Sequence, residues 1–420
     1  MTRLSRVQTL GVCFGLLGAA LLRVAAALPG EDVTLAIGLG DAAPEFPLDP
    51  PNAVLGIAVV YLLAAAVALA ERWTGRYAAV LLGIAAALFA PLLLLCAMAL
   101  SDRGQANLLP LVTESLRLGT PIALGALAGL WCERSGVVNI GIEGMMLAGA
   151  GIGFMVYAVG GGGQGGPWLY LAVVAAAVVG GVMAAVHAGL SVTFRTDQIV
   201  SGVAINLLAI GITSFVRRQV ILPSGVRSAT TLPSIDLPGL SSIPVVGEQL
   251  FSGKPIFLSM FVIFAVTQLT LFRSAWGLRV RSVGENPHAA ETLGVDVVRT
   301  RYQAVIVGGV IAGIAGAWFS LETTGSFDNL MTNGRGFIAL AALIFGKWRP
   351  WSAFGGAMLF GFSEALGSRI QLLQVEVGGF PVPSQFLQTL PFVVTIVVLA
   401  GAIGRAIPPA AVGVPYQRPR

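Results

Sequence analysis

The feature that most limits the fold of this chain is a series of long apolar stretches separated by short polar segments. A helix needs roughly 20 apolar residues to cross the hydrocarbon core of a bilayer, and most of these stretches are near that length. Only 11% of the residues are charged, whereas a soluble domain carries about 25%. The sequence therefore predicts an all-α polytopic membrane protein with roughly 10 to 12 transmembrane helices. The expected spans are 8–28, 53–70, 77–100, 116–132, 141–159, 168–194, 198–215, 256–272, 303–321, 336–346, 351–367 and 385–404.

The placement of Lys and Arg predicts the orientation of these spans, because cytoplasmic loops carry an excess of both. With the N-terminus inside, most of the 25 basic residues fall on the cytoplasmic side, and segments 30–52 and 222–255 face outward. We expect a multi-pass protein of the cell (inner) membrane with both termini in the cytoplasm. Orientation and anionic membrane lipid account for the net charge of +5, so no nucleic-acid partner is expected.

No catalytic or metal-binding pattern stands out in the sequence. The two histidines, His187 and His288, cannot build a metal site by themselves. Neither GxSxG nor HExxH occurs, and the phosphate-cradling pattern GxxxxGK[ST] is also missing. We therefore expect a protein that is not an enzyme, with no catalytic residue and no metal site.

Polar residues within membrane spans are costly and are functional candidates by default. The spans near 141 and 336 are short and interrupted by glycine, which is typical of the broken helices at transporter binding sites. One hypothesis is that these two stretches are equivalent parts of an internal repeat. For each polar residue alone, a hydrogen bond between helices is the ordinary alternative. The candidate substrate pathway comprises Asn139, Glu143, Asn206, Glu322 and Asn333.

The longest polar segment on the predicted inner side is 273–301, which holds five arginines. It predicts a short helix from Pro287 to Leu293, with Asn286 as the N-cap and Gly294 just beyond the C-terminus. On composition alone, this segment is either an ordinary charged loop or a docking helix for a cytoplasmic partner.

Four motifs follow one another along the chain: 133–146 (ERSGVVNIGIEGMM), 197–208 (DQIVSGVAINLL), 277–295 (GLRVRSVGENPHAAETLGV) and 335–349 (RGFIALAALIFGKWR). The first is similar to the signature that opens the core of ABC importer permeases of the branched-chain amino acid and simple sugar class. The third resembles the cytoplasmic coupling loop of that class. The second and fourth look most like its nucleoside and simple-sugar subgroup.

This resemblance implies three regions: extra N-terminal spans at 1–112, a permease core at 113–404 and a cytoplasmic tail at 405–420. It also implies a permease subunit of an ATP-driven importer, with purine nucleosides as the favoured substrate. The implied partners are a cytoplasmic ABC ATPase, a second and different permease subunit, an extracytoplasmic substrate-binding lipoprotein and membrane lipid. No cofactor is expected in this chain, since the partner ATPase would use the ATP.

The resemblance further implies that the helix within 273–301 couples the permease to its ATPase. Small alanines at 289 and 290 are expected to let this helix seat in a groove of the ATPase. The residues carried over to the coupling loop are Gly284, Glu285, Asn286, Pro287, Ala289, Ala290 and Gly294.

Other functions remain open at this stage. A permease for simple sugars would satisfy the same polar residues. A proton-coupled secondary transporter would use Glu143, Glu322 or Glu364 as its coupling carboxylate. A structural scaffold without transport would move no solute.

Overall fold

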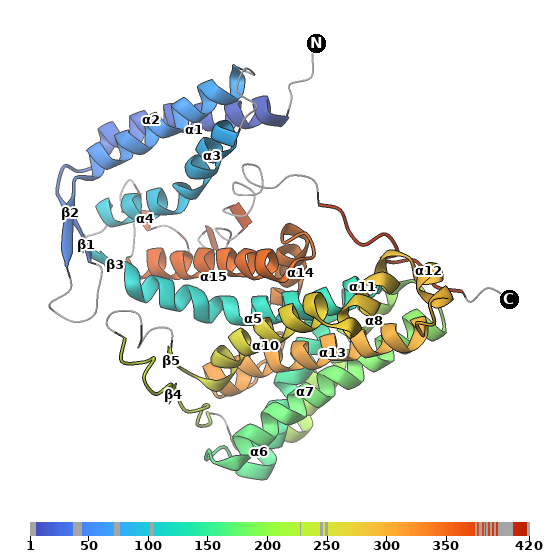
Figure 1. Ribbon diagram of the computed structural model, residues 1–420. Coiled ribbons are helices and arrows are strands. Elements are labelled where there is room, and N and C mark those ends of the chain that lie inside the picture. The colour runs from blue at the N-terminus through green and yellow to red at the C-terminus, as the bar shows by residue number, and fades with distance from the viewer. Residues whose placement is uncertain are drawn as a thin grey trace. The chain divides into compact units, whose positions relative to one another are not determined.

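The computed structural model describes residues 6–36, 44–70, 76–100, 105–226, 228–243, 247, 251–373, 376–377, 380–381, 383, 385–386, 389, 392–393 and 406–417. Helices dominate this part of the chain, and the few strands are short (Figure 1). The chain divides into two compact units, one formed by 1–116 with 359–405 and the other by 117–358 with 406–420. The first unit thus takes in the end of the region expected to be permease core.

The first unit contains four N-terminal helices and the larger of the small sheets. Glycines at 11 and 18 of α1 lie against α2, where a Cβ at either position would come within 2.9 Å of a side-chain atom. Such small residues let helices approach closely in lipid. Strand β1 pairs antiparallel with β2 and parallel with β3. The elements are α1 (Arg6–Ala27), β1 (Val33–Ala36), β2 (Glu45–Leu48), α2 (Pro50–Leu69), α3 (Arg76–Ala87), α4 (Phe89–Ala99) and β3 (Gln105–Asn107).

The expected span 77–100 is wrong as a single helix, because the structure breaks it at Leu88 into α3 and α4. Pro91 explains the break. Its ring nitrogen has no hydrogen to donate to the carbonyl of Ala87, and the ring would crowd that carbonyl in a continuous helix.

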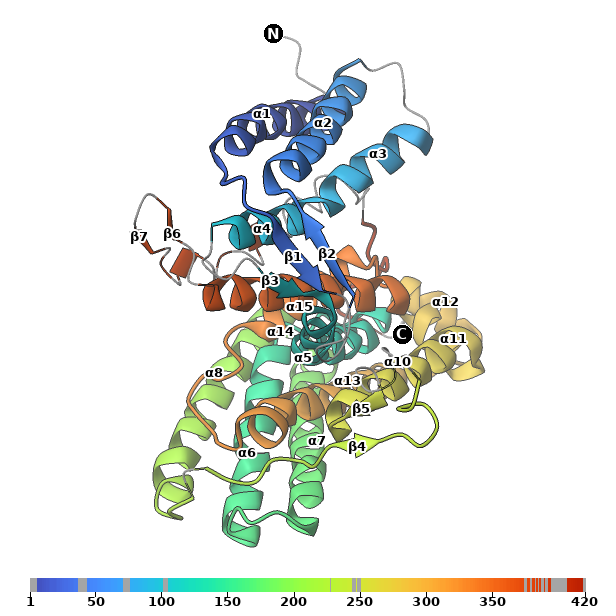
Figure 2. The ribbon, with the colours of Figure 1, turned by 90° about the vertical axis from the view of Figure 1, so that its left-hand side faces the viewer.

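Most of the second unit is an all-helical assembly, in which α6 packs against α7, α8 and α13 (Figure 2). Three helices continue into wider π-helical turns named η. The elements from here on are α5 (Leu108–Arg134), α6 (Ile142–Gly161), α7 (Pro167–Ala188), η1 (Gly189–Thr193), α8 (Gln198–Val216), η2 (Arg217–Ile221), β4 (Ile235–Asp236), β5 (Ser252–Gly253), α10 (Pro255–Arg273), α11 (Ala275–Glu285), α12 (Pro287–Thr292), α13 (Val297–Ala317), η3 (Trp318–Thr324), α14 (Arg335–Phe345), α15 (Pro350–Leu372), β6 (Glu376–Val377) and β7 (Phe380–Pro381). The division between the units falls within α5 and α15.

Glycine allows backbone contact among α6, α7 and α13. A Cβ at Gly149 of α6 would lie 2.5 Å from the carbonyl oxygen of Gly313 on α13. A Cβ at Gly180 of α7 would lie 2.7 Å from the amide nitrogen of the same residue. Any larger side chain at this crossing would force the three helices apart.

The all-α polytopic class is confirmed. Within the described residues, seven helical segments are long and apolar enough to cross a membrane, and α14 and most of α1 are shorter apolar helices. Most of the expected span 385–404 lies outside the described residues.

Replacing Gly313 with Ala should destabilise the protein, because the new methyl group would meet the backbone carbonyl of Ala176. Overpacking of this kind costs about 1–3 kcal/mol. Gly211 on α8 is the matched control, since a Cβ there has open space and alanine favours a helix by up to about 1 kcal/mol. Thermal unfolding of the purified protein should show a lower Tm for Gly313→Ala and an equal or higher one for Gly211→Ala. Equal Tm values for Gly313→Ala and the parent would contradict the packing.

Candidate functional site

The first helix break lies between α5 and α6, where residues 135–141 leave the helical path. The amide of Val138 donates a hydrogen bond to Gln198 Oε1 (2.6 Å). The carbonyl of Val138 accepts one from His187 Nε2 (2.9 Å), whose Nδ1 lies 2.9 Å from Ser201 Oγ. The His187 ring is buried and both of its nitrogens are engaged, which suits a structural role better than proton relay.

Asn206 of α8 caps the start of α6. Its Oδ1 accepts from the amide of Gly144 (2.7 Å), and its Nδ2 donates to the carbonyl of Ile140 (3.1 Å). The first amides of a helix have no partner within it, so a side chain must supply one where water is absent. Asn139 is fully buried nearby, with its Nδ2 facing the sulfurs of Cys132 and Met145.

The second break lies between η3 and α14, and the Glu143 carboxylate accepts hydrogen bonds from its residues. One oxygen of the Glu143 carboxylate accepts from Thr332 Oγ1 (2.6 Å) and the Gly334 amide (2.9 Å). The other accepts from the Gly336 amide (2.6 Å). A carboxylate at a helix N-terminus also meets the positive end of the helix dipole. Glu143 therefore joins the start of α6 to the start of α14.

Residues 325–334 present the polar groups of this second break. Asp328, Asn329 and Asn333 are exposed, and Asp328 pairs with Arg217 of η2 (2.8 Å). Leu330 and Asn333 have positive φ angles of 60° and 47°. Such strained backbone clusters at ligand sites and switch regions. Asn333 is among the residues expected from the sequence, whereas Asp328 and Arg217 are not, although the polar run between two apolar spans is a visible signal.

Glu322 belongs to η3, and its side chain caps the start of α10. Its carboxylate accepts from the amides of Ile256 (2.6 Å) and Phe257 (3.1 Å). Lys254 donates to the backbone carbonyl of Glu322. Burial lowers the pKa of Lys254, and the Glu322 carboxylate counteracts part of that shift. The structure thus groups Asn139, Glu143, Asn206 and Asn333 around the starts of α6 and α14, apart from Glu322.

The expected short helix in 273–301 is present as α12. Asn286 caps it by accepting from the amide of Ala289 (3.0 Å), Pro287 occupies its first turn, and Gly294 follows with φ of 82°. Helix α11, which fills most of 273–285 and is capped by Ser274, is not expected from the sequence.

The expected docking face of α12 needs a correction at Ala290. This residue is only 2% exposed and packs with Val283, Val297 and Tyr416 inside the protein, so it cannot seat in a partner's groove. Ala289 is exposed, and Leu293 just after the helix is 84% exposed. The outward face of α12 therefore includes Ala289, and the exposed Leu293 follows just beyond its end.

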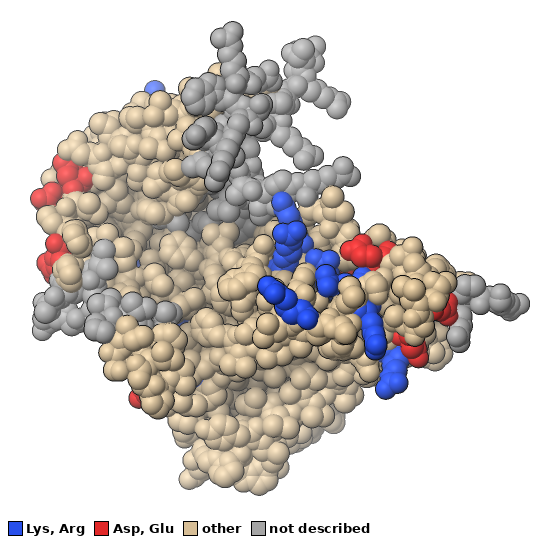
Figure 3. All heavy atoms as spheres, viewed as in Figure 1, with Lys and Arg blue, Asp and Glu red and all other residues tan. Residues whose placement is uncertain are grey.

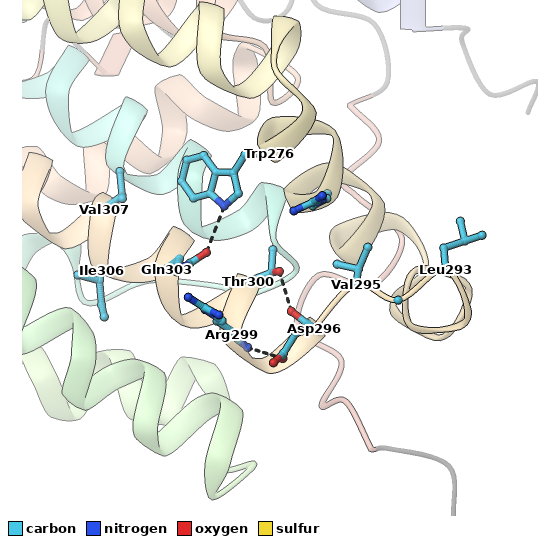
Figure 4. Close-up of a pocket in the computed structure, with 11 residues that line it drawn as sticks. Trp276, Leu293, Val295, Asp296, Arg299, Thr300, Gln303, Ile306 and Val307 are labelled. Atoms are coloured by element: carbon cyan, nitrogen blue, oxygen red, sulfur yellow. Dashed lines mark hydrogen bonds between the residues drawn. The ribbon is translucent and has the colours of Figure 1, made fainter.

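A pocket of about 740 Å³ lies beside α12, between α11 and the start of α13 (Figure 4). Trp276 donates to Gln303 Oε1 (3.2 Å) at one end, and Leu293 stands at the other. Basic side chains gather on this side of the second unit (Figure 3), and Arg279 and Arg299 line the pocket. An exposed apolar side chain beside arginines is suited to contact with another protein.

Three of the four sequence motifs meet at the end of α5. Arg134 Nε donates to the carbonyl of Trp348 (2.8 Å), and Arg134 Nη1 lies 3.7 Å from Glu285 Oε1. The indole of Trp348 in turn donates to the carboxylate of Glu133. The remaining motif joins through Asn206 at the start of α6. Helix α12 and the two helix breaks are thus parts of one connected arrangement.

The family described as "Branched-chain amino acid transport system / permease component" matches residues 111–399. The chain belongs to this family. Helices α1 to α4 precede the matched region. Membership makes the chain a multi-pass membrane protein of a transport system.

Three relatives show the same relationship. The guanosine ABC transporter permease protein NupQ of Bacillus subtilis is 39% identical over 73% of this chain and 96% of its own length. The nucleoside ABC transporter permease protein NupC of Lactococcus lactis is 37% identical, over 73% and 96%. The putative glucose ABC transporter permease protein TsgC13 of Haloferax volcanii is also 37% identical, over 70% and 92%.

Replacing Glu143 with Gln should lower the stability of the second unit, because an amide group would face donors that now meet a carboxylate oxygen. Losing a hydrogen bond to a charged group costs about 1.5–3 kcal/mol. Thr332→Val removes only one of the three bonds and should cost less. The same change at exposed Glu114 is the control. If thermal unfolding gave equal Tm values for Glu143→Gln and Glu114→Gln, the capping role would be wrong.

Proposed function

We propose that this chain is a transmembrane permease subunit of an ATP-driven importer for purine nucleosides, coupled to its ATPase through α12. The observation that carries the proposal is the direct connection between an exposed helix and two helix breaks. Glu285, the last residue of α11 just before α12, pairs with Arg134 at the end of α5, and the break at 135–141 follows at once. Movement of α12 would therefore reach the starts of α6 and α14.

The partner at α12 is a cytoplasmic ABC ATPase that supplies the ATP-binding loop missing from this sequence. Leu293 and Ala289 would enter its groove, with Arg279 and Arg299 at the rim. A second, different permease subunit would complete the pathway, and an extracytoplasmic lipoprotein would deliver substrate. Residues 406–417 hydrogen-bond to α11 through Ala411, so this segment lies on the same side as α12. That side is the cytoplasm in this proposal.

Two relatives named for guanosine or nucleoside transport support a nucleoside substrate. A nucleoside is uncharged and rich in hydrogen-bonding groups, and Asn329 and Asn333 offer exposed amides at the second break. Simple sugars are the second candidate, because the relative from Haloferax is named for glucose.

Proton coupling fits the geometry less well. Glu143 and Glu322 each hold backbone amides at the start of another helix, and protonation would weaken those bonds. A coupling carboxylate must instead lose and regain its proton in every cycle.

Uptake of radiolabelled guanosine and glucose by cells with and without this gene tests both energy source and substrate. We expect the gene to confer guanosine uptake that survives an uncoupler while ATP is maintained. Glucose uptake alone would replace the substrate, whereas guanosine uptake that follows only the proton gradient would overturn the ATP-driven mechanism.

Replacing Leu293 with Asp should abolish ATP-driven uptake, because a charge would be buried at the ATPase contact. The protein should fold normally, since the side chain is 84% exposed. Leu240→Asp is the matched control, as Leu240 is also exposed but lies in the segment predicted to face outward. Co-purification of the ATPase with each variant checks the result, and equal recovery with both would refute docking at α12.

A further inference from the structure

The C-terminal segment 406–417 is held by backbone hydrogen bonds to two different parts of the second unit. The amide of Ala411 donates to the carbonyl of Gly284 at the end of α11 (2.9 Å). The amide of Gly413 donates to the carbonyl of Gly136 in the first helix break (3.2 Å). The segment thus bridges the end of α11 and the first helix break, which are far apart in sequence.

The Glu285 carboxylate at the end of α11 strengthens this bridge. Glu285 Oε2 accepts from the amide of Ala410 (3.2 Å), while Glu285 Oε1 lies 3.7 Å from Arg134 Nη1. Glu285 is half exposed, and surface ion pairs of this kind contribute little by themselves. The hydrogen bonds from the C-terminal segment therefore matter for holding α11 against the end of α5.

Arg301 of α13 makes the bridge energetically important, because it is a fully buried cation. Its Nε donates to the carbonyl of Ser135 in the break (3.2 Å), and its Nη1 donates to the carbonyl of Val414 (3.2 Å). Its Nη2 has no hydrogen-bond partner within the described part of the chain. A buried charge that loses an acceptor is costly, so release of the segment would disturb the break as well.

Tyr416 anchors the far end of the segment under α12. It is buried in the cluster that contains Ala290 of α12 and Val283 of α11, and its ring lies 5.3 Å from the ring of His288. The inward face of α12 therefore rests on the C-terminal segment.

We propose that segment 406–417 is a positioning element for the coupling step, which passes movement of α12 to the break between α5 and α6. This inference rests on the proposed function. Tyr416 would move together with α12, because it packs against Ala290. Ala411 bonds to the end of α11, Gly413 to the break, and the carbonyl of Val414 to Arg301. The segment contacts neither substrate nor ATP and acts only through these elements.

Hydrogen exchange of the purified full-length protein tests the physical link. Tyr416→Ala should speed amide exchange both in α12 and at 135–141, although the ring lies in the cluster with Val283, Ala290 and Val297 and not in the break. Tyr416→Phe keeps the ring and should behave like the parent, and Gln417→Ala changes an exposed neighbour as the control. Faster exchange confined to the helices that share this cluster, with none at 135–141, would overturn the link to the break.

The number of ATP molecules hydrolysed per guanosine imported tests the coupling role in cells or vesicles carrying the complete transporter. For Tyr416→Ala this ratio should rise about fivefold or more, as expected for a lost coupling free energy of at least about 1 kcal/mol. Ala411→Pro, which removes the donor to Gly284, should also raise the ratio. Tyr416→Phe keeps the ring and should show the parent ratio.

A merely structural segment gives a different result: uptake and hydrolysis fall together with the amount of folded protein, and the ratio stays constant. That outcome, or unchanged uptake, overturns the inference while the parent still imports guanosine. Failure of the parent itself to import guanosine with ATP overturns the proposed function, and the hydrogen-exchange result identifies the physical link independently.

Discussion

The second unit depends on one requirement: a helix that starts inside a membrane protein must find partners for its first amides without water. Asn206 meets that requirement for α6, Glu143 for α14 and Glu322 for α10. In each case the capping side chain comes from a different helix. The caps therefore fix the arrangement of helices as well as their ends.

The same requirement explains which polar side chains remain exposed and able to contact a solute. In four of the five candidate residues, the side chain hydrogen-bonds to another part of the protein and stabilises the fold. These are Asn139, Glu143, Asn206 and Glu322. Asn333 is the exposed member, and it lies in the strained second break beside Asp328. Polar character within a span marks an important residue, but burial decides whether that residue supports the structure or meets the solute.

Local signals predicted the all-α class, most of the spans and α12, because apolar length, an Asn-Pro start and a following glycine act within a few residues. The break at Leu88 was also encoded locally, by Pro91. Other features could not be found in this way. Glu143 meets partners 189 to 193 residues away. Helix α12 has only six residues, too few for a periodic pattern to show that Ala290 faces inward.

The glycine crossing of α6, α7 and α13 has a mechanical consequence. Where main chains touch directly, no side chain stands between them that can change rotamer and absorb a displacement. These three helices would consequently move as one rigid group. The alternation between outward and inward access would then depend on movement of the elements around them. One helix break leads into α6 and the other leads from η3 into α14, so each would be the hinge between this rigid group and a moving element.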